Sequence, residues 1–364
     1  MQPRAGSSTA VIHRWLTHAE AVLTDHRSEL NAINVFPVPD SDTGSNLVQT
    51  VTAAVAGLPA IPQPPHHGED RAANGVVDLG AILGAAGAQA LEHARGNSGT
   101  ILAVMLSAMA EPLAGQSRLT PPTLAAALER ASVRCWSALS DPVPGTMLSV
   151  IEAAAAACAR HASGRDGDES HAGLVAVLDG VLDAAATAVE ATEEQNDVLA
   201  RARVVDSGAV GLLLILQCLR WALTGDPVAV EPLEHLDGLD HGGHVEAMDG
   251  VEIMCSINLS PLDAASLRIA LDELGDSVIL TAITPVGEQS AGVAGSGTAG
   301  AGTAGSGTAG SGTAGSGTAY RWRLHAHVPH DAHDRALAVI SGSGSPENLV
   351  VSSLRAEETP EPHQ

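Results

Sequence analysis

A short segment carries two aspartates that could bind a metal ion. In NVFPVPDSDTGSN, residues 34–46, Asp40 and Asp42 lie one residue apart, between a proline-stiffened stretch and an expected helix start. Carboxylate oxygens that converge on one small space suit Mg²⁺ bridging substrate phosphates. Residues 43–46 open the helix, where free N–H groups and the helix dipole favour phosphate. The spacing alone leaves an alternative open, because Asp-x-Asp before a helix is also common as a capping turn.

Three more expected helix starts carry polar residues beside glycine. They are RGNSG at 95–99, PGT at 144–146 and DSG at 206–208. In the first, glycines let the backbone approach an anion, and Asn97 and Ser98 add side-chain donors. Each turn alone is more often an ordinary N-cap. Four such starts in one helical region predict a shared rim that binds a nucleotide.

The elements that must position these turns are helices. Apolar residues recur at helical spacing from residue 8 to residue 224, as in Ile12, Trp15, Leu16, Ala19 and Leu23. Similar stretches lie at 50–58, 79–91, 98–110, 122–139, 146–161, 174–189 and 206–223. We predict about eight helices in an antiparallel bundle or barrel, with the chemistry in the loops at one end.

The sequence changes character after an expected linker at residues 225–247. Residues 248–346 predict a small α+β domain, with strands at 251–259, 277–284 and 321–328 and helices at 261–274 and 331–340. An AGSGT repeat at 291–319 is expected to be a flexible insertion, and residues 347–364 a disordered tail. The predicted fold class is therefore multidomain, α followed by α+β.

Composition excludes several classes of function. The chain has 364 residues, a formal net charge of −24, and 18 basic residues that are all arginine. A surface this acidic repels nucleic-acid phosphates and anionic lipid, so we expect no nucleic-acid partner. The absence of lysine excludes Schiff-base chemistry and a Walker-type phosphate lysine.

Cysteine usage and hydropathy predict a cytoplasmic protein. The four cysteines are far apart and form no CxxC pair, so neither a disulfide framework nor a four-cysteine zinc module is expected. No signal-peptide run opens the chain, and the most apolar stretch, at 210–223, is interrupted by Gln217 and Arg220. We therefore expect no stable membrane insertion.

Four phrases taken together resemble a known family. NVFPVPDSDTGSN, ARGNSGTIL, PVPGTML and VVDSGAVGL are similar, in order and spacing, to the nucleotide-binding domain of the dihydroxyacetone kinase L-subunit superfamily, in the branch found in bacterial fatty acid kinases. The resemblance covers residues 8–224, with Ser41 and Ser45 in place of the usual Gly and Thr. It implies an eight-helix antiparallel barrel that binds ATP and two Mg²⁺ ions at one end.

The resemblance also implies roles for individual residues. Asp40 and Asp42 correspond to the principal Mg²⁺ ligands, and Asn34 to a third. The positions that correspond to other nucleotide contacts are Thr43, Asn46, Asn97, Ser98, Gly99, Thr146, Met147 and Asp206. Arg95 is the nearest cation in these motifs; it is expected either to neutralise phosphate charge during catalysis or to form a surface ion pair.

The expected second domain is similar to the fatty acid kinase middle domain, where a cysteine and an HxH pair bind zinc. The matching residues are Cys255 on the first expected strand and His325 with His327 on the last. Residues two apart on a strand share a face, so both imidazoles could meet a thiolate from a neighbouring strand and leave one zinc position open. The alternative is surface histidines and a core cysteine.

The leading function implied by the resemblance is an ATP-dependent kinase. It would transfer the γ-phosphoryl group to the carboxylate of a fatty acid held by a separate fatty acid-binding carrier protein. A homodimer through the middle domain is expected. The family's further C-terminal domain has no counterpart before Gln364, so carrier docking is expected to use the middle domain or another subunit. Two alternatives are a dihydroxyacetone-type sugar kinase subunit and a non-catalytic nucleotide-binding dimeric regulator.

Overall fold

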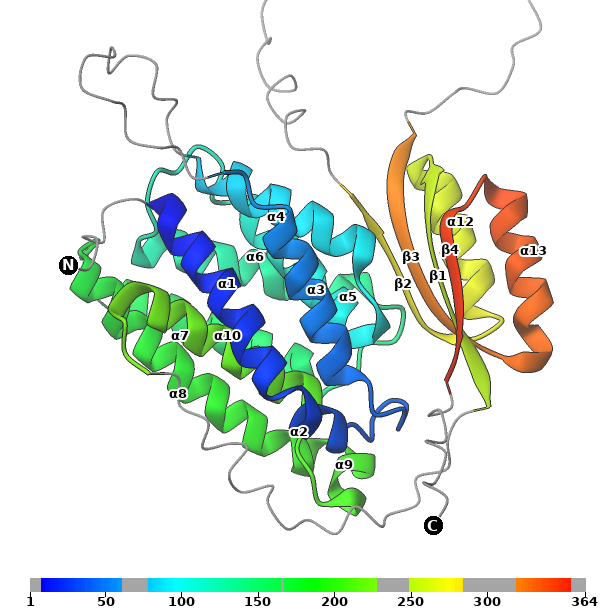
Figure 1. The fold of residues 1–364 in the computed structure, drawn as a ribbon, viewed down its shortest axis with the longest axis horizontal. Coiled ribbons are helices and arrows are strands. Elements are labelled where there is room, and N and C mark those ends of the chain that lie inside the picture. The colour runs from blue at the N-terminus through cyan, green and yellow to red at the C-terminus, as the bar shows by residue number, and fades with distance from the viewer. Residues whose placement is uncertain (1–7, 61–77, 165–166, 228–248, 284–318, 355–364) are drawn as a thin grey trace, which may run out of the picture.

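The computed structural model describes residues 8–60, 78–164, 167–227, 249–283 and 319–354 (Figure 1). Within these ranges, the chain before residue 225 is helical. Its helices are α1 (Ser8–Asp25), α2 (Arg27–Ala32), α3 (Thr43–Ala56), α4 (Leu79–His93), α5 (Gly96–Ala110), α6 (Pro121–Ala138), α7 (Met147–Ser163), α8 (His171–Gln195), α9 (Asp197–Ala202) and α10 (Ser207–Thr224). Eight of them are long, whereas α2 and α9 have six residues each.

The long helices share one apolar core. Each packs against the next long helix in the chain, and α10 returns to pack against α1. Trp15 is 1% exposed and donates its indole N–H to the Ile215 carbonyl at 2.8 Å, which joins α1 to α10. With few aromatic residues available, the core is filled by Leu, Ile, Val and Ala side chains. The eight-helix barrel implied by the resemblance stays a prediction; the structure shows eight long helices around a common core.

A glycine lets the first turn of α3 lie against α2. A Cβ atom at Gly44 would be 2.9 Å from the Leu30 Cβ and nearer still to the Arg27 carbonyl oxygen. Backbone atoms cannot move aside as a flexible side chain can, so the contact requires a residue without a side chain. This contact fixes the start of α3, and with it the expected metal-binding loop.

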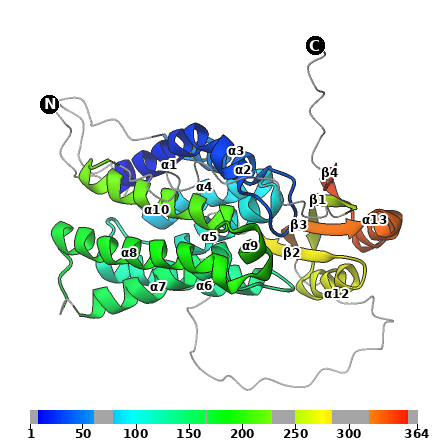
Figure 2. The same cartoon turned by 90° about the horizontal axis from the view of Figure 1, so that it is seen from below.

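The second part is a four-stranded antiparallel sheet of order β2-β3-β1-β4 with two helices. Its elements are β1 (Gly250–Leu259), α12 (Pro261–Asp272), β2 (Asp276–Ala282), β3 (Tyr320–Pro329), a 3₁₀ turn (His330–Ala332), α13 (His333–Ser343) and β4 (Glu347–Ser353). The two helices cover one face of the sheet, and the other face abuts the helical part (Figures 1 and 2).

The two faces of this sheet bury different side chains. Toward α12 and α13, the strands contribute an apolar core that includes Ile253, Cys255 and Leu324. Toward the helical part, the buried residues include Glu252 and His325. Because both faces are covered, nine of the ten residues of β1 are buried.

Strands and helices are present where the second domain was predicted, with one correction at its end. The prediction of disorder from residue 347 is wrong for Glu347–Ser353, which forms β4 and pairs antiparallel with β1. Its serines and glutamate looked typical of a tail, but an edge strand keeps one side in water and tolerates polar residues. The expected linker, apart from residues 225–227, the AGSGT repeat and the last ten residues lie outside the described ranges.

Two helices of the described chain are long and apolar enough to cross a membrane, namely α8 and α10. In α10, 78% of the apolar window is buried among the other helices, as in the core helix of a globular protein; in α8 the share is 39%. The expectation of no stable membrane insertion stays a prediction.

Because α3 lies so close to α2 at Gly44, we expect that adding one methyl group at this residue lowers the stability of the protein considerably. We expect Gly44→Ala to lower the free energy of unfolding by about 2 kcal/mol, because the backbone of α2 must shift. Gly342→Ala is the matched control, since no atom lies within 4 Å of its added Cβ and helix propensity favours alanine. Urea denaturation measures both; equal stabilities would contradict the proposed close contact.

Candidate functional site

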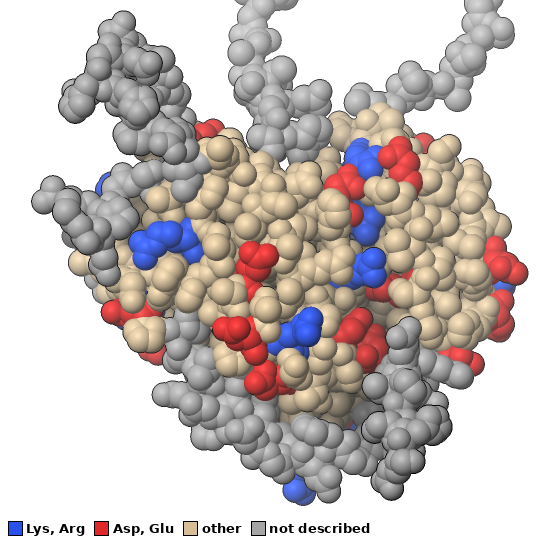
Figure 3. Space-filling model, in the orientation of Figure 1, with Lys and Arg blue, Asp and Glu red and all other residues tan. Residues whose placement is uncertain are grey.

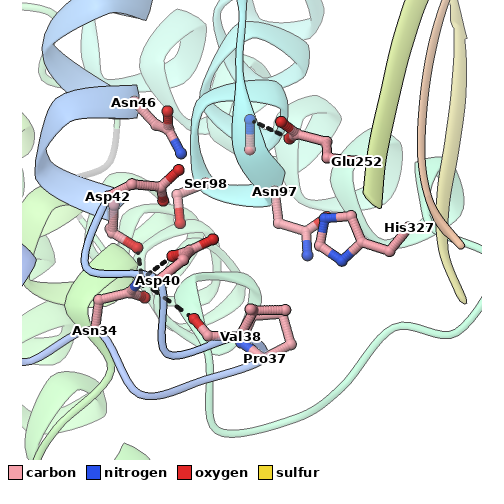
Figure 4. A pocket seen from close by; sticks show the side chains of 12 residues that line it. Asn34, Pro37, Val38, Asp40, Asp42, Asn46, Asn97, Ser98, Glu252 and His327 are labelled. Atoms are coloured by element: carbon pink, nitrogen blue, oxygen red, sulfur yellow. Dashed lines mark hydrogen bonds between the residues drawn. The ribbon is translucent and has the colours of Figure 1, made fainter. Parts of the chain in front are cut away.

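The loop between α2 and α3 is organised by Asn34. This side chain is 5% exposed; its Nδ2 donates to Asp40 Oδ1 at 2.6 Å and to the Val38 carbonyl at 3.3 Å. Its Oδ1 accepts a hydrogen bond from Thr43 Oγ1 at 2.7 Å. Asn34 thus holds Asp40 against the start of α3 (Figure 4). Its role as a third Mg²⁺ ligand stays a prediction, because its amide is engaged within the loop here.

Asp42 does not act as a helix cap. It is the residue before α3, yet its side chain accepts no capping hydrogen bond from the helix. Its carboxylate instead lies beside Asp40, and both aspartates line the pocket together with Asn46. Ser41, between the two aspartates, has a φ of 56°, a conformation that suits the glycine found there in the family. The capping-turn alternative is therefore wrong, and both carboxylates face the pocket.

The two carboxylates are held in a setting that disfavours their charge. Burial and the charge of Asp42 raise the pKa of Asp40 to about 8, and burial also raises the pKa of Asp42. Without a cation the pair therefore retains a proton at neutral pH. A divalent cation can replace that proton and remove the repulsion, which makes this pair a suitable site for Mg²⁺.

The start of α5 lies opposite the aspartates. Gly96 has a φ of 62°, and an added Cβ at this residue would clash with Asn46 Nδ2. At Gly99, an added Cβ would be 2.5 Å from Thr50 Oγ1, so this glycine serves the close packing of α5 on α3. Asn97 and Ser98 line the pocket, and Asn97 Oδ1 is buried without a hydrogen-bond partner.

The other two expected helix starts lie behind Ser98. A Cβ at Gly208 would be 3.0 Å from Ser98 Oγ and 3.5 Å from Met147 Cβ, so α5, α7 and α10 begin close together. Asp206 Oδ1 accepts hydrogen bonds from the Met147 and Ala209 N–H groups, and burial raises its pKa to about 6.

Four nucleotide positions implied by the resemblance do not line the described pocket, namely Gly99, Thr146, Met147 and Asp206. The Met147 N–H donates to Asp206 and joins the starts of α7 and α10, whereas the Thr146 hydroxyl donates to the Val143 carbonyl. Arg95 is exposed and also lies outside the pocket lining. The nucleotide-binding roles of these four residues, and the catalytic role of Arg95, stay predictions.

The predicted zinc site needs a correction in one ligand. In the register of the sheet, Cys255 faces Leu324 and packs in the apolar core toward the helices, whereas His325 and His327 lie on the opposite face. Burial in this apolar core raises the pKa of the Cys255 thiol to about 11, as expected of a cysteine that fills a core. Because successive side chains of β1 point to opposite faces of the sheet, Glu252, three residues before Cys255, lies on the face of the two histidines.

Glu252, His325 and His327 form a buried cluster that fits a metal ion. Their ligand atoms lie within 4.8 Å of one another, and the side chains are 8%, 1% and 4% exposed. Nε2 of His325 and Nδ1 of His327 have no hydrogen-bond partner, whereas Nδ1 of His325 lies 3.2 Å from Glu252 Oε1. Since buried polar groups are rarely left unpaired, these nitrogens indicate a missing ligand. Two imidazoles and one carboxylate are a donor set of catalytic zinc and of non-haem iron(II).

The protonation states of the cluster agree with metal binding. Burial lowers the pKa of His327 to about 3, so its imidazole is neutral. Burial alone would raise the pKa of Glu252, but the adjacent His325 and His327 lower it to about 2. A neutral imidazole and an ionised carboxylate are the forms that ligate metals. Sequence reasoning missed Glu252, although an acidic residue inside an otherwise apolar strand was a signal.

The two candidate metal sites lie on opposite walls of one pocket. Asp40, Asp42, Asn97 and Ser98 come from the helical part, and Glu252 and His327 come from the sheet (Figure 4). The charge of Glu252 contributes to the raised pKa values of Asp40 and Asp42. The sequence had placed these groups in separate domains and did not predict that they meet.

Contacts between the two parts hold the pocket closed. Arg321 forms an ion pair with Glu92 of α4, and Arg323 Nη2 donates to the Ala94 carbonyl at the end of that helix at 3.2 Å. The Ser140 N–H also donates to the Val278 carbonyl of β2 at 3.1 Å. Figure 3 shows basic and acidic side chains alternating along this junction.

The raised pKa of Asp40 predicts how stability depends on pH. Between its ordinary value of 3.8 and about 8, the folded protein holds a proton that the unfolded chain has released, so stability falls as pH rises. We expect Asp40→Asn to stabilise the metal-free protein by about 2 kcal/mol at pH 8 and much less at pH 4. Urea denaturation in the presence of a chelator measures this. Asp183→Asn, on the exposed side of α8, should show no such pH-dependent gain, and a pH-independent effect of Asp40→Asn would contradict the assignment.

The corrected cluster predicts the metal content of the purified protein. We expect about one transition-metal ion per chain, lost in His325→Ala and retained in Cys255→Ala. Elemental analysis by mass spectrometry measures both, with circular dichroism as the folding control. Loss of the ion in Cys255→Ala but not in His325→Ala would restore the cysteine as a ligand.

Comparison with known proteins identifies the family. The DAK2 domain model matches residues 37–220. The chain is similar to Protein YloV of Bacillus subtilis, with 27% identity over 275 residues, which is 71% of this chain and 46% of that protein. It is also similar to an uncharacterized protein of Staphylococcus epidermidis, with 26% identity over 271 residues and the same shares of the two chains. The chain thus spans about half the length of the curated relatives it matches. It belongs to the DAK2 domain family, a kinase-related family.

Proposed function

We propose that this protein is an ATP- and Mg²⁺-dependent phosphotransferase. The observation that carries the proposal is the half-buried pair Asp40 and Asp42, whose carboxylates line one pocket side by side, where burial raises the pKa of both. The pair faces the start of α5, a helix end suited to phosphate. Membership of a kinase-related family supports the same class of reaction.

The residues around the pocket fit ATP with two Mg²⁺ ions. Bound Mg²⁺ would neutralise charge on the phosphates, which is the chief requirement of phosphoryl transfer. Asn34 orients Asp40, and Asn97 and Ser98 present polar groups at the helix start. Glu252 and His327 form the facing wall and reduce the access of water. For the cluster that includes these two residues we propose Zn²⁺, supported by its two imidazoles and one carboxylate.

We propose that the acceptor is the carboxylate of a fatty acid presented by a separate carrier protein. A carboxylate is already ionised and needs no general base, so positioning and charge neutralisation suffice. The pocket lining supports presentation by a carrier, because Val38 and Pro37 are its apolar side chains and leave no surface for an acyl chain. Free fatty acid should accordingly be a poor acceptor.

The proposal also includes the partners of the protein and its location in the cell. Carrier docking and a homodimer through the small domain follow from the family resemblance and stay predictions, since the chain spans about half of its curated relatives. A cytoplasmic location is supported by the four cysteines, which are all buried and free of disulfides.

A direct test compares acceptors. Purified protein, Mg²⁺ and ATP are incubated with a fatty acid-loaded bacterial carrier protein, with free fatty acid or with dihydroxyacetone, and acyl phosphate is trapped by hydroxylamine. We expect acyl hydroxamate with the loaded carrier. Turnover of dihydroxyacetone would indicate a sugar kinase, and Mg-ATP binding without turnover of any acceptor would indicate a nucleotide-binding regulator.

The proposed role of the aspartate pair predicts that a variant of Asp42 binds nucleotide more weakly. Asp42→Asn should lower Mg²⁺-dependent nucleotide affinity by at least about tenfold, because it removes a carboxylate ligand, and leave the helical circular dichroism unchanged. Asp183→Asn makes the same chemical change on the exposed side of α8 and should bind as the parent does. Equal affinity of Asp42→Asn and the parent, measured with a fluorescent ATP analogue, would exclude this site.

A further inference from the structure

One carboxylate belongs to both walls of the pocket. Glu252 Oε1 accepts a hydrogen bond from the Gly96 N–H at 2.9 Å, and the same oxygen lies 3.2 Å from His325 Nδ1. Its second oxygen, Oε2, accepts from Ser352 Oγ of β4 at 2.9 Å. The side chain is 8% exposed, so these contacts form away from water.

The contact with Gly96 gives Glu252 a role at the start of α5. Arg95, the residue before this helix, provides no side-chain cap, and the carboxylate from the sheet takes that place. The next residues, Asn97 and Ser98, line the pocket that faces Asp40 and Asp42. A negative charge on the first N–H of the helix therefore lies where phosphate is proposed to bind.

The contact with His325 gives the same carboxylate a role in the metal cluster. His325 and His327 are almost fully buried, and their unpaired nitrogens point to a ligand that Glu252 would share. An ion there would cancel the charge that Glu252 holds against incoming phosphate. Glu252, His325 and His327 would provide three protein ligands to such an ion.

We infer that Glu252 couples ion binding by His325 and His327 to phosphate binding at the start of α5, so that the two ligands bind cooperatively. The inference rests on the proposed nucleotide site, but it concerns binding and does not require turnover. Because coupling is reciprocal, the ion must tighten the nucleotide by the same factor as the nucleotide tightens the ion. We expect a factor of about ten or more.

The test measures both affinities in the full chain with excess Mg²⁺. Zn²⁺ affinity is measured by competition with a chromophoric chelator, with and without a non-hydrolysable ATP analogue. Nucleotide affinity is measured by fluorescence anisotropy, with and without Zn²⁺. Equal tightening in both directions supports the inference. Independent affinities, or no nucleotide binding in either state, overturn it.

Two variants separate the functions of the carboxylate. Glu252→Gln keeps an oxygen that can accept from Gly96 but removes the charge. It should weaken Zn²⁺ binding, abolish the coupling and raise the nucleotide affinity that is measured without Zn²⁺. His325→Ala leaves the bond to Gly96 intact and should bind nucleotide as the zinc-free parent does. Cys255→Ala should keep the full coupling.

The outcomes separate this inference from the proposed kinase activity. If the Zn²⁺ and nucleotide affinities remain coupled in Glu252→Gln, other groups carry the coupling and the role of Glu252 is overturned. Intact coupling without phosphoryl transfer to any acceptor would support the inference and contradict the proposed function. Thermal melts of each variant identify any that fail to fold. If Glu252→Gln fails to fold, Glu252→Asp replaces it. This variant keeps the charge on a shorter side chain and should weaken the coupling.

Discussion

Three carboxylates around one pocket, of which Glu252 is buried and the two aspartates are half-buried, are the constraint on which the rest of the site depends. Asp40 and Asp42 face each other from the helical part, and Glu252 adds its charge from the sheet. Ionised groups this close destabilise the fold unless cations or protons balance them. Burial and the neighbouring charges of Asp42 and Glu252 raise the pKa of Asp40 for this reason. The proposed metal ions would supply the balancing positive charge.

Close packing keeps these charges in place despite their repulsion. Gly44 brings α3 onto α2, and Gly99 brings α5 onto α3, so the walls of the pocket are fixed by backbone contacts. Asn34 then ties the loop of Asp40 to the first turn of α3. The opposite wall is fixed by the docking of the sheet through Arg321 and other interdomain contacts. Alanine-rich helices suit this arrangement, because small side chains allow helices to approach closely.

The sequence predicted the local motifs of the site, but it did not predict how these motifs come together in space. The Asp-x-Asp loop, the polar helix starts and the HxH pair could be found because each is a local pattern. Two features could not, because they depend on strand register and on docking. In the observed register Glu252 is opposite His327 and lies on the face of the histidines, whereas Cys255 is opposite Leu324 and lies on the other face. A shift of one residue would exchange the two faces, and no local pattern encodes that choice. The strand β4 was missed because edge strands tolerate the polar residues of a tail.

The distribution of positive charge supports the proposal that metal ions complete this site. The chain has no lysine, and neither Arg nor Lys lines the described pocket. Arg321 and Arg323 lie nearby, but they bind Glu92 and the end of α4 and so hold the two parts together. Arginine suits this role, since its planar guanidinium bonds in a fixed geometry and stays charged when buried. The arginines thus assemble the pocket, and under the proposed function the positive charge that a phosphate requires would come from ions bound to the carboxylates and histidines of the pocket.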